Sequence, residues 1–348
     1  MSRIFVCGCG AVSPAGWGLA ELQQALSAGQ PLPVQPLARP GWDKPLRMRA
    51  VPPPKTKPAF LAHPRLRRTS PITHYAAAAV LEAMKNLPPA PARRVGLVVC
   101  LQSGCVQYTE RFFAEALADA ATASPLLFPE TVFAAPASHL AALLEHTPRI
   151  CTLMGDPATF AQGLTLAADW LQQDQLDVVG VVGSEEINWL RADALWHLEH
   201  AAIISGGAGA ITLCRDSNLS GGAELAAVTR PRSYSARCSR RQAAAGVRAE
   251  LGRREQELLC DSLGDSPRAD APESAAWRDW PGPRLSPKKI LGEGLMAAAA
   301  WQCVAACAAA AAQQHPSAIA SLTGCNQQAI GVRFQACPDL LDSRNIRP

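Results

Sequence analysis

Short apolar runs alternate with helix-like stretches through the first half of the chain, and this order constrains the fold more than any other feature. Apolar runs of about four to eight residues favour buried strands, whereas longer segments with a period near about 3.6 favour helices. Strands are predicted at Ile4–Cys9, Val95–Cys100, Ile150–Met154, Val178–Val182 and Gly209–Leu213. Helices are predicted at Ala20–Ser27, Thr73–Lys85, Glu110–Ala121, Ser138–Glu145 and Thr159–Gln172. This alternation predicts a layered α/β fold with a mixed sheet.

A second half is predicted to begin near Ser220, which divides the chain into residues 1–219 and 220–348. The 348-residue length suits about two domains or one large α/β unit. The predicted elements are a strand at Glu224–Val228, helices at Arg241–Leu259 and Gly294–Ala312, and strands at Ile319–Leu322 and Ala329–Gln335. The Pro- and Arg-rich segments Gln30–Lys57 and Gly264–Pro287 are predicted to be loops.

Composition excludes several classes of protein. A hydrophobic content of 48% provides a sizeable core and excludes a disordered chain. The net charge of +4 is too small to argue for nucleic-acid binding by itself. Gln302 interrupts the long apolar stretch Met296–Ala312, which therefore indicates a packed helix and no membrane span. The apolar run near the N-terminus is too short for a signal peptide.

The twelve cysteines and the paired histidines give no sign of a disulfide scaffold or a metal site. The cysteines are scattered through apolar segments without CxxC spacing, so we expect reduced, buried thiols in a cytosolic protein. His197 and His200 flank Glu199, but no third ligand is spaced nearby, and solvated or packed roles are predicted for them. We expect no metal ion and no cofactor.

Six segments, in chain order, carry a resemblance to a known family. They are VCGCGAVSPAGWGLAELQQALSAGQ, FPETVFAAPASHLAALL, LAADWLQQDQLDVVGVVGSEE, ISGGAGAITL, SPRADAPESAAW and SPKKILGEGLMAAAAWQ. The first resembles the opening strand, G-x-G-x-x-S-P turn and first helix of the β-ketoacyl synthases. The third ends in a Gly-x-Glu turn at Gly183 and Glu185, and the last two resemble catalytic loops of that family. The chain is thus similar to β-ketoacyl-ACP synthases over most of its length.

This resemblance implies a thiolase-like fold, with two similar α-β-α-β-α halves around mixed sheets. Residues 1–219 would form the N-terminal half, and residues 220–348 a shortened C-terminal half. Members of the family usually form dimers by antiparallel pairing of one strand from each subunit. By resemblance, the pairing strand here comprises Arg149, Ile150, Cys151, Thr152, Leu153 and Met154.

The same resemblance places other residues at the catalytic positions. Family members use a Cys thiolate at a helix N-terminus and two His residues to condense malonyl and acyl groups. The alignment puts Pro157 at the nucleophile in TLMGDPATFAQG, Ser262 at the first His in CDSLGDSPRAD, and Glu293 at the second His in KKILGEGLMAA. The glycine-rich oxyanion loop is degraded to LTGCNQQA at Leu322–Ala329. The chain therefore resembles a ketosynthase without ketosynthase chemistry.

Other residues leave an enzymatic alternative open. Cys105 follows Gly104 in a strand-to-helix turn and is the best surviving candidate for a reactive thiol. Asp156 and Glu293 are candidates for a carboxylate pair that performs acid/base chemistry. His139, in the second resembling segment, is predicted to be structural.

Arginines cluster in two segments. Their members are Arg65, Arg67 and Arg68, and Arg230, Arg232, Arg237, Arg240 and Arg241. They form either a solvated surface or a docking site at which guanidinium groups bind the carboxylates and phosphopantetheine phosphate of an acyl carrier protein. Few aromatic residues accompany them, which disfavours nucleic acid as the partner.

These observations favour one function over two others. The leading hypothesis is a non-catalytic subunit, similar to a chain-length factor, that pairs with an active β-ketoacyl-ACP synthase in the cytoplasm. It would serve type II polyketide, aryl-polyene or specialised fatty-acid synthesis. The alternatives are an acyltransferase or hydrolase with a non-standard nucleophile, and a homodimeric scaffold that binds a carrier protein.

Overall fold

The computed structural model describes residues 3–90, 92–145, 149–198 and 200–337. The first five strands of the main sheet are β1 (Phe5–Ser13), β5 (Val95–Leu101), β6 (Arg149–Met154), β7 (Val178–Glu185) and β9 (Gly207–Cys214). They lie in the order β1-β9-β7-β5-β6, with β5 parallel to β6 and β7 and with β9 antiparallel to β7 and β1. These are the five strands predicted from the apolar runs.

The second half of the sheet repeats this pattern. Its strands are β10 (Ala223–Val228), β12 (Leu258–Cys260), β13 (Arg284–Leu285), β14 (Ser317–Thr323) and β15 (Gln328–Ala336). They lie in the order β13-β12-β14-β15-β10, where β12 is parallel to β13 and β14, and β15 is antiparallel to β14 and β10. Because β10 takes the place that β1 has in the first half, we propose a division of the chain near residues 219 and 220.

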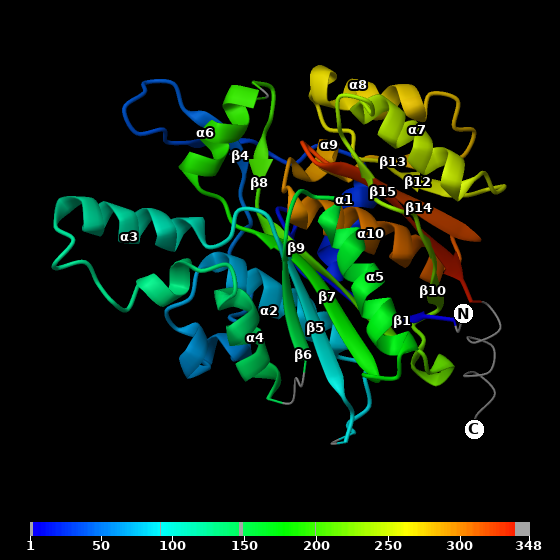
Figure 1. Ribbon diagram of the computed structural model, residues 1–348, viewed down its shortest axis with the longest axis horizontal. Coiled ribbons are helices and arrows are strands. Elements are labelled where there is room, and N and C mark those ends of the chain that lie inside the picture. The colour runs from blue at the N-terminus through cyan, green and yellow to red at the C-terminus, as the bar shows by residue number, and fades with distance from the viewer. Residues whose placement is uncertain (1–2, 91, 146–148, 199, 338–348) are drawn as a thin grey trace.

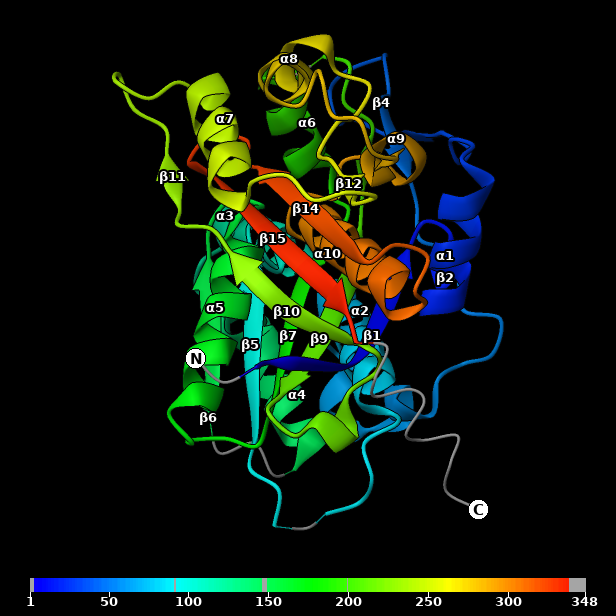
Figure 2. The same cartoon turned by 90° about the vertical axis from the view of Figure 1, so that its right-hand side faces the viewer.

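The helices cover and separate the two half-sheets (Figures 1 and 2). They are α1 (Leu19–Ala28), α2 (Pro71–Met84), α3 (Val106–Ala118), α4 (Ala135–Leu144), α5 (Thr159–Gln172), α6 (Trp189–Leu198), α7 (Arg240–Leu251), α8 (Pro267–Ala276), α9 (Pro287–Leu291) and α10 (Met296–Ala311). Helix α10 contacts strands of both halves, α2 packs on β1, β7 and β9, and α7 packs on β14 and β15. This arrangement confirms the predicted thiolase-like layering.

Minor elements connect these layers. The short strands are β2 (Gly16–Trp17), β3 (Gln35–Leu37), β4 (Leu46–Arg49), β8 (Ile204–Ser205) and β11 (Arg232–Ser233). The 3-10 helices are η1 (Ala59–Ala62), η2 (Pro64–Leu66), η3 (Phe128–Thr131) and η4 (Ser217–Leu219). Strand β4 pairs with β3 and β8, which form a small second sheet beside α6. Among the described residues, no helix is long and apolar enough to cross a membrane.

The Ala-rich composition of α10 follows from its central position. Nearly all its residues are buried, and a Cβ added at Gly209 of β9 would lie 2.8 Å from the Cβ of Ala300. A Cβ added at Gly183 of β7 would lie 2.9 Å from the carbonyl oxygen of Met296. Small residues on both sides therefore allow the helix and the sheet to approach closely. The prediction that this segment is a packed core helix is confirmed.

Two predicted elements of the second half are wrong. The predicted helix Arg241–Leu259 ends at Leu251, because Gly252 adopts φ 64°, and Leu258–Cys260 forms a strand instead. The predicted loop Gly264–Pro287 contains α8, which begins with Pro267 in its first turn, where the missing N–H carries no penalty. Apolar periodicity is weak in α8, which explains why the pattern did not reveal it.

Candidate functional site

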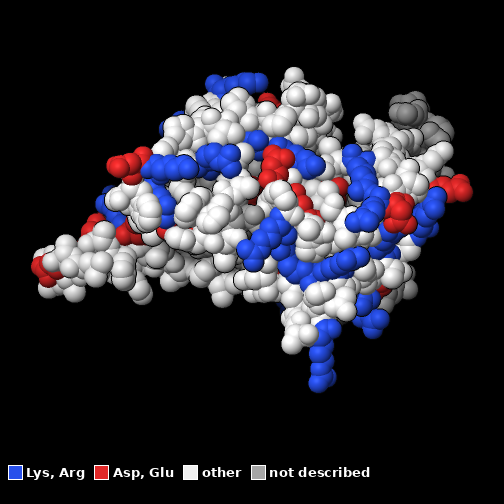
Figure 3. Space-filling view, turned by 90° about the horizontal axis from the view of Figure 1, so that it is seen from above, with Lys and Arg blue, Asp and Glu red and all other residues white. Residues whose placement is uncertain are grey.

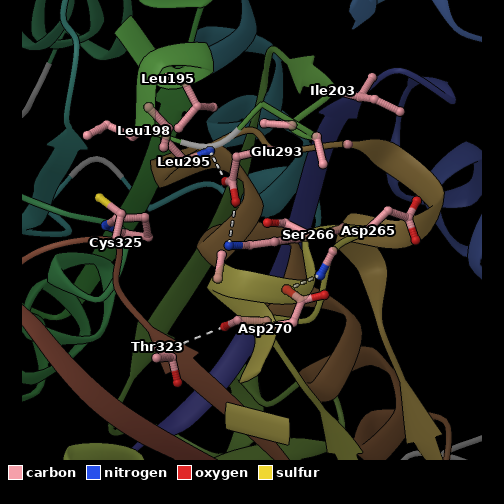
Figure 4. Close-up of a pocket in the computed structure, with 18 of the residues that line it drawn as sticks. Leu195, Leu198, Ile203, Asp265, Ser266, Asp270, Glu293, Leu295, Thr323 and Cys325 are labelled. Carbon is pink, nitrogen blue, oxygen red and sulfur yellow. Dashed lines mark hydrogen bonds and ion pairs between the residues drawn. The ribbon is translucent and has the colours of Figure 1, made fainter. Parts of the chain in front are cut away.

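The three positions that the sequence aligns with catalytic residues lie in the wall of one cavity, which Figure 4 shows with Glu293 labelled. Pro157, Ser262 and Glu293 all line this space, which has a volume of about 540 Å³. They come from the segment just before α5, from the segment after β12 and from the segment between α9 and α10. The alignment, made from sequence alone, thus identified positions that are far apart in the chain and close in the fold.

Pro157 has no group that can act as a nucleophile. The side chain of the neighbouring Asp156 is hydrogen-bonded to the loop between β14 and β15. Asp156 is fully buried, and its Oδ2 accepts hydrogen bonds from the N–H groups of Gln327, at 3.0 Å, and Gln328, at 3.2 Å. A Cβ at Gly324 would lie 1.9 Å from this oxygen, so the approach requires glycine there. The loop that resembles a degraded oxyanion hole therefore has amides that already bind an internal carboxylate.

Ser262 is engaged through its hydroxyl group. Its Oγ donates to the carbonyl of Ser321 at 2.7 Å and accepts from the N–H of Thr323 at 3.2 Å. The Nε2 group of Gln302, on α10, donates to the same oxygen at 3.1 Å. These bonds tie the segment after β12 to β14 and α10. At the position that the sequence aligns with a catalytic His, the hydroxyl is therefore a structural hydrogen-bonding group.

Glu293 forms an ion pair with the buried Lys288 of α9. The Lys288 Nζ lies 2.8 Å from Glu293 Oε2, and the N–H of Leu295 donates to Glu293 Oε1 at 2.7 Å. Burial lowers the pKa of Lys288, but the adjacent Glu293 carboxylate outweighs burial and raises it overall. Lys288 therefore stays protonated, and neither partner supplies a free general base.

The carboxylate pair considered from sequence, Asp156 with Glu293, does not form. Asp156 binds the amides of the 327–328 segment, whereas Glu293 binds Lys288 and the N–H of Leu295. Burial raises the pKa of Asp156, and the backbone N–H groups oppose that rise. The structure gives these two carboxylates separate structural roles.

Glu273, in the wall of the cavity, has a raised pKa that makes the stability of the protein depend on pH. Burial raises the pKa of its carboxyl to about 7, with a further rise from the Asp261 carboxylate, while the Ser262 N–H donates to it at 3.1 Å. Because the folded state favours the protonated Glu273 carboxyl, protonation stabilises the fold. This stabilisation is complete below the ordinary pKa of Glu and is lost as the pH rises through about 7. The Glu273→Gln variant should therefore lose less stability between about pH 5 and pH 8 than the unmodified chain, by roughly 2–3 kcal/mol.

Urea unfolding of both forms at these two pH values measures that difference. The exposed Glu255→Gln substitution is the control and should leave the decline with pH unchanged. An equal decline in the Glu273→Gln variant and the unmodified chain would contradict the assigned ionisation of Glu273.

A buried ion pair behind the cavity was not predicted from sequence. Arg191 Nη1 of α6 lies 3.5 Å from Glu185 Oε2 of β7, and both side chains are almost fully buried. Glu185 Oε1 also accepts from the N–H of Gln102 at 2.6 Å and of Ser103 at 3.2 Å, and Arg191 Nη2 donates to the carbonyl of Ser205 at 2.5 Å. The pair holds α6, β7, β8 and the segment after β5 together around the cavity. The Gly-x-Glu turn was the only sequence signal of it.

Cys105, the candidate reactive thiol, is buried at the start of α3. Burial raises the pKa of its thiol, and the carboxylates of Glu186, Glu130 and Glu185 raise it further. A thiol in these surroundings stays protonated near neutral pH. All twelve cysteines are free.

The histidines considered from sequence lie outside the cavity wall. His139 Nε2 lies 2.9 Å from both carboxylate oxygens of Glu130, which ties α4 to η3. His197 is exposed, 3.7 Å from Asp193, and its ring contacts Trp196. His200 is also exposed, and Glu199 lies outside the described residues. Among the described residues, no cluster of His, Cys, Asp and Glu has the arrangement of a metal site.

The two arginine clusters occupy different parts of the molecule. Arg65, Arg67 and Arg68 are exposed around η2, which contacts α4, whereas the second cluster surrounds β11 and α7. In that second cluster, Glu250 pairs with Arg232 at 2.8 Å and with Arg230 at 3.9 Å. Figure 3 shows Lys and Arg interspersed with Asp and Glu on the face seen from above. The clusters therefore do not form one continuous basic surface.

Strand β6 lies at one edge of the main sheet. It pairs with β5 and with no other strand among the described residues. Its side chains are partly or fully exposed, and Ile150 and Met154 are 37% and 61% exposed. The six residues expected at a dimer interface therefore form an open sheet edge with the exposed apolar side chains of Ile150 and Met154, and such an edge is a template for pairing with another chain.

An apolar arm flanks this edge. Helix α3 projects from the body in Figure 1 and has no buried residue among those described. Large apolar side chains are exposed along α3 and the segment after it, at Phe113, Leu117, Leu126, Phe128, Val132 and Phe133. Helix α4 contacts both η3 and β6, which places the base of this arm beside the sheet edge. Clusters of exposed apolar side chains are typical of interaction sites.

Comparisons with known proteins show the fold. No family model matches the chain, and no curated protein matches it. The ishigamide ketosynthase/chain length factor structure superposes with a TM-score of 0.84 at 17% identity, covering 97% of this chain and 99% of that one. A β-ketoacyl synthase from Burkholderia phymatum STM815 gives 0.78 at 16% identity, covering 97% and 100% of the two chains. The ketosynthase ApeO in complex with its chain length factor ApeC, from Xenorhabdus doucetiae, gives 0.77 at 12%, covering 97% and 98%.

The fold is therefore the thiolase-like fold of ketosynthase and chain length factor structures. This confirms the fold class and the resemblance predicted from the sequence.

Proposed function

We propose that this chain is a non-catalytic subunit, similar to a chain-length factor, that pairs with an active β-ketoacyl-ACP synthase. One observation carries the proposal: Pro157, Ser262 and Glu293 stand at the three aligned catalytic positions around one cavity. None of them supplies a thiolate or an imidazole, which condensation in this family requires. The Ser262 hydroxyl and the Glu293 carboxylate are instead engaged in structural contacts.

The β6 edge and the α3 arm support pairing with a second subunit of the same fold. Both are exposed and apolar, and α4 connects them. A stable heterodimer would bury on the order of 2,000 Å² or more, largely apolar. Burial of this apolar surface would provide the free energy for association with the partner. In the complex, this subunit would form part of the wall of a shared acyl tunnel.

The proposal also includes the biosynthetic system in which the subunit acts and the carrier protein that it binds. We place the complex in the cytoplasm, in type II polyketide, aryl-polyene or specialised fatty-acid synthesis. The exposed Arg65, Arg67, Arg68, Arg237 and Arg241 are the candidates for binding an acidic carrier, because Arg230 and Arg232 already face Glu250. One solved neighbour is a type II acyl-carrier protein in complex with its ketosynthase, at 15% identity and a TM-score of 0.78.

The purified chain is expected to condense no acyl and malonyl carrier-protein substrates. The Pro157→Cys variant should also fail, because a restored thiol still lacks both imidazoles and the loop amides remain bound to Asp156. Radiolabelled malonyl carrier protein, with product measured against a no-enzyme control, tests both forms. Turnover by the isolated chain, or stoichiometric acylation of it, would favour the alternative of an acyltransferase or hydrolase.

A further inference from the structure

The N-terminus of α8, a ten-residue helix, faces the cavity with unused hydrogen-bond donors. Ser266 is its N-cap residue but makes no side-chain capping bond. Ser266 is only 7% exposed, and its Oγ has no hydrogen-bond partner although it lines the cavity. The first-turn N–H groups of Arg268 and Ala269 also lack an intrahelical acceptor. Two independent observations thus indicate an acceptor group, an anion above all, at this point.

The charges around the cavity leave room for one negative charge. Lys288 pairs with Glu293, and Arg191 pairs with Glu185. Arg49 has the Asp265 carboxylate as its neighbouring negative charge. Two further guanidinium groups in the cavity wall, those of Arg240 and Arg268, are accompanied by two further carboxyl groups, those of Asp270 and Glu273.

Asp270 lies in the first turn of α8, and its carboxylate accepts from the N–H of Gly264 at 2.9 Å and from the backbone N–H of the N-cap residue Ser266. The Ser266 Oγ is left without a hydrogen-bond partner. Glu273, also in the cavity wall, is partly protonated near neutral pH because its pKa is raised to about 7. A monoanion balances the remaining charge better than a doubly charged phosphate does.

Apolar side chains also line the cavity. They are those of Ala194, Leu195, Leu198, Ala201, Ala202, Ile203 and Leu295. Figure 4 shows Leu195, Leu198 and Leu295 on the far side of Glu293 from Ser266 and Asp270. The volume of about 540 Å³ is within the range of small-molecule sites, which is about 300–1,000 Å³.

We propose that this cavity binds a free amphipathic monocarboxylate, with its carboxylate at the N-terminus of α8 and its chain against α6. Ser266 Oγ and the first-turn N–H groups hold the carboxylate oxygens, while Arg268 and Arg240 supply the positive charge. The thiol of Cys325 also lines this space, but burial raises its pKa and keeps it protonated, so the ligand is bound without being transformed. The inference does not depend on the proposed pairing with a ketosynthase.

Isothermal titration calorimetry of the full chain with decanoate, below its micellar concentration, tests the site. Decanoate should bind saturably, acetate should not because it lacks a chain, and decanol should bind at least about 10-fold more weakly because it lacks the charge. The Arg268→Ala and Ser266→Ala variants should each weaken decanoate binding about 3- to 30-fold. Arg278→Ala is the matched control, since this exposed arginine just after α8 does not line the cavity.

A second variant, among the apolar residues of the cavity wall, tests the proposal even if Ser266→Ala fails to fold. Leu198 is 73% exposed, so Leu198→Asp should preserve the fold and abolish decanoate binding. Equal affinity for decanol and decanoate, or unchanged affinity in Arg268→Ala and Leu198→Asp, would overturn the proposal. Binding of decanoate only when it is carried as a carrier-protein thioester would also overturn it, because the free carboxylate is then not the ligand.

Discussion

Replacing Arg191 by methionine is expected to lower the free energy of unfolding by about 3–5 kcal/mol, because it leaves Glu185 as an unpaired buried charge. Arg191 is the ion-pair partner of Glu185, and its guanidinium also donates to the carbonyls of Glu186 and Ser205 at 2.5 Å each. Those two carbonyls would lose a charged donor inside the protein. Urea unfolding of the isolated chain measures the loss.

The double variant Glu185→Gln/Arg191→Met should be less destabilised than Arg191→Met alone. Burial raises the pKa of Glu185 and lowers the pKa of Arg191, so burial disfavours both charged forms and the pair is costly to assemble. Removing both charges therefore removes that cost. Arg111→Met, on the exposed face of α3, is the control and should change stability by less than about 0.5 kcal/mol. A loss below about 1 kcal/mol in Arg191→Met would show that the pair does not stabilise the cavity wall.

Placing proline at Cys151 is expected to weaken association with an active ketosynthase by about 3 kcal/mol or more. Cys151 lies in the middle of β6, opposite Val98 of β5, and proline removes a backbone donor and disturbs the strand at the open edge. Pull-down and size-exclusion chromatography of co-expressed subunits measure the effect. The exposed Gln173→Ala, after α5, is the control and should leave assembly intact.

A second variant separates the interface from the internal sheet. Met154 is exposed, so Met154→Asp should leave the isolated chain folded while placing an unpaired charge in an apolar interface. Circular dichroism should show the native fold for Met154→Asp, and co-purification should be lost. Retention of the complex by both Cys151→Pro and Met154→Asp would remove β6 from the interface.

The parts of the fold that the sequence predicts are those where burial and periodicity coincide. Strands β5 and β7 are covered on both faces and appear as unbroken apolar runs, and α5 was predicted with its observed limits. The end of α7 was missed because polar residues continue past Leu251, and the backbone turns at Gly252, which adopts a positive φ. Local pattern does not distinguish a polar helix from the polar turn that follows it.

The sequence predicted which residues lie at the candidate site, but it did not predict the hydrogen bonds and ion pairs that they form. Alignment placed Pro157, Ser262 and Glu293, because each follows a segment with recognisable neighbours. The hydrogen bonds between Asp156 and the N–H groups of Gln327 and Gln328 join residues that are 171 and 172 positions apart in the chain. No local sequence pattern indicates that these residues are in contact. Such long-range contacts depend on how the half-sheets pack, which periodicity does not encode.

Native mass spectrometry of this chain, co-expressed with an active β-ketoacyl-ACP synthase and incubated with a labelled acyl carrier protein, tests most directly whether the chain is a non-catalytic partner subunit. We expect a 1:1 heterodimer in which the acyl label is found only on the partner, because this chain has no nucleophile at Pro157. A homodimer that persists in the presence of the partner, or acyl label on this chain, would contradict it.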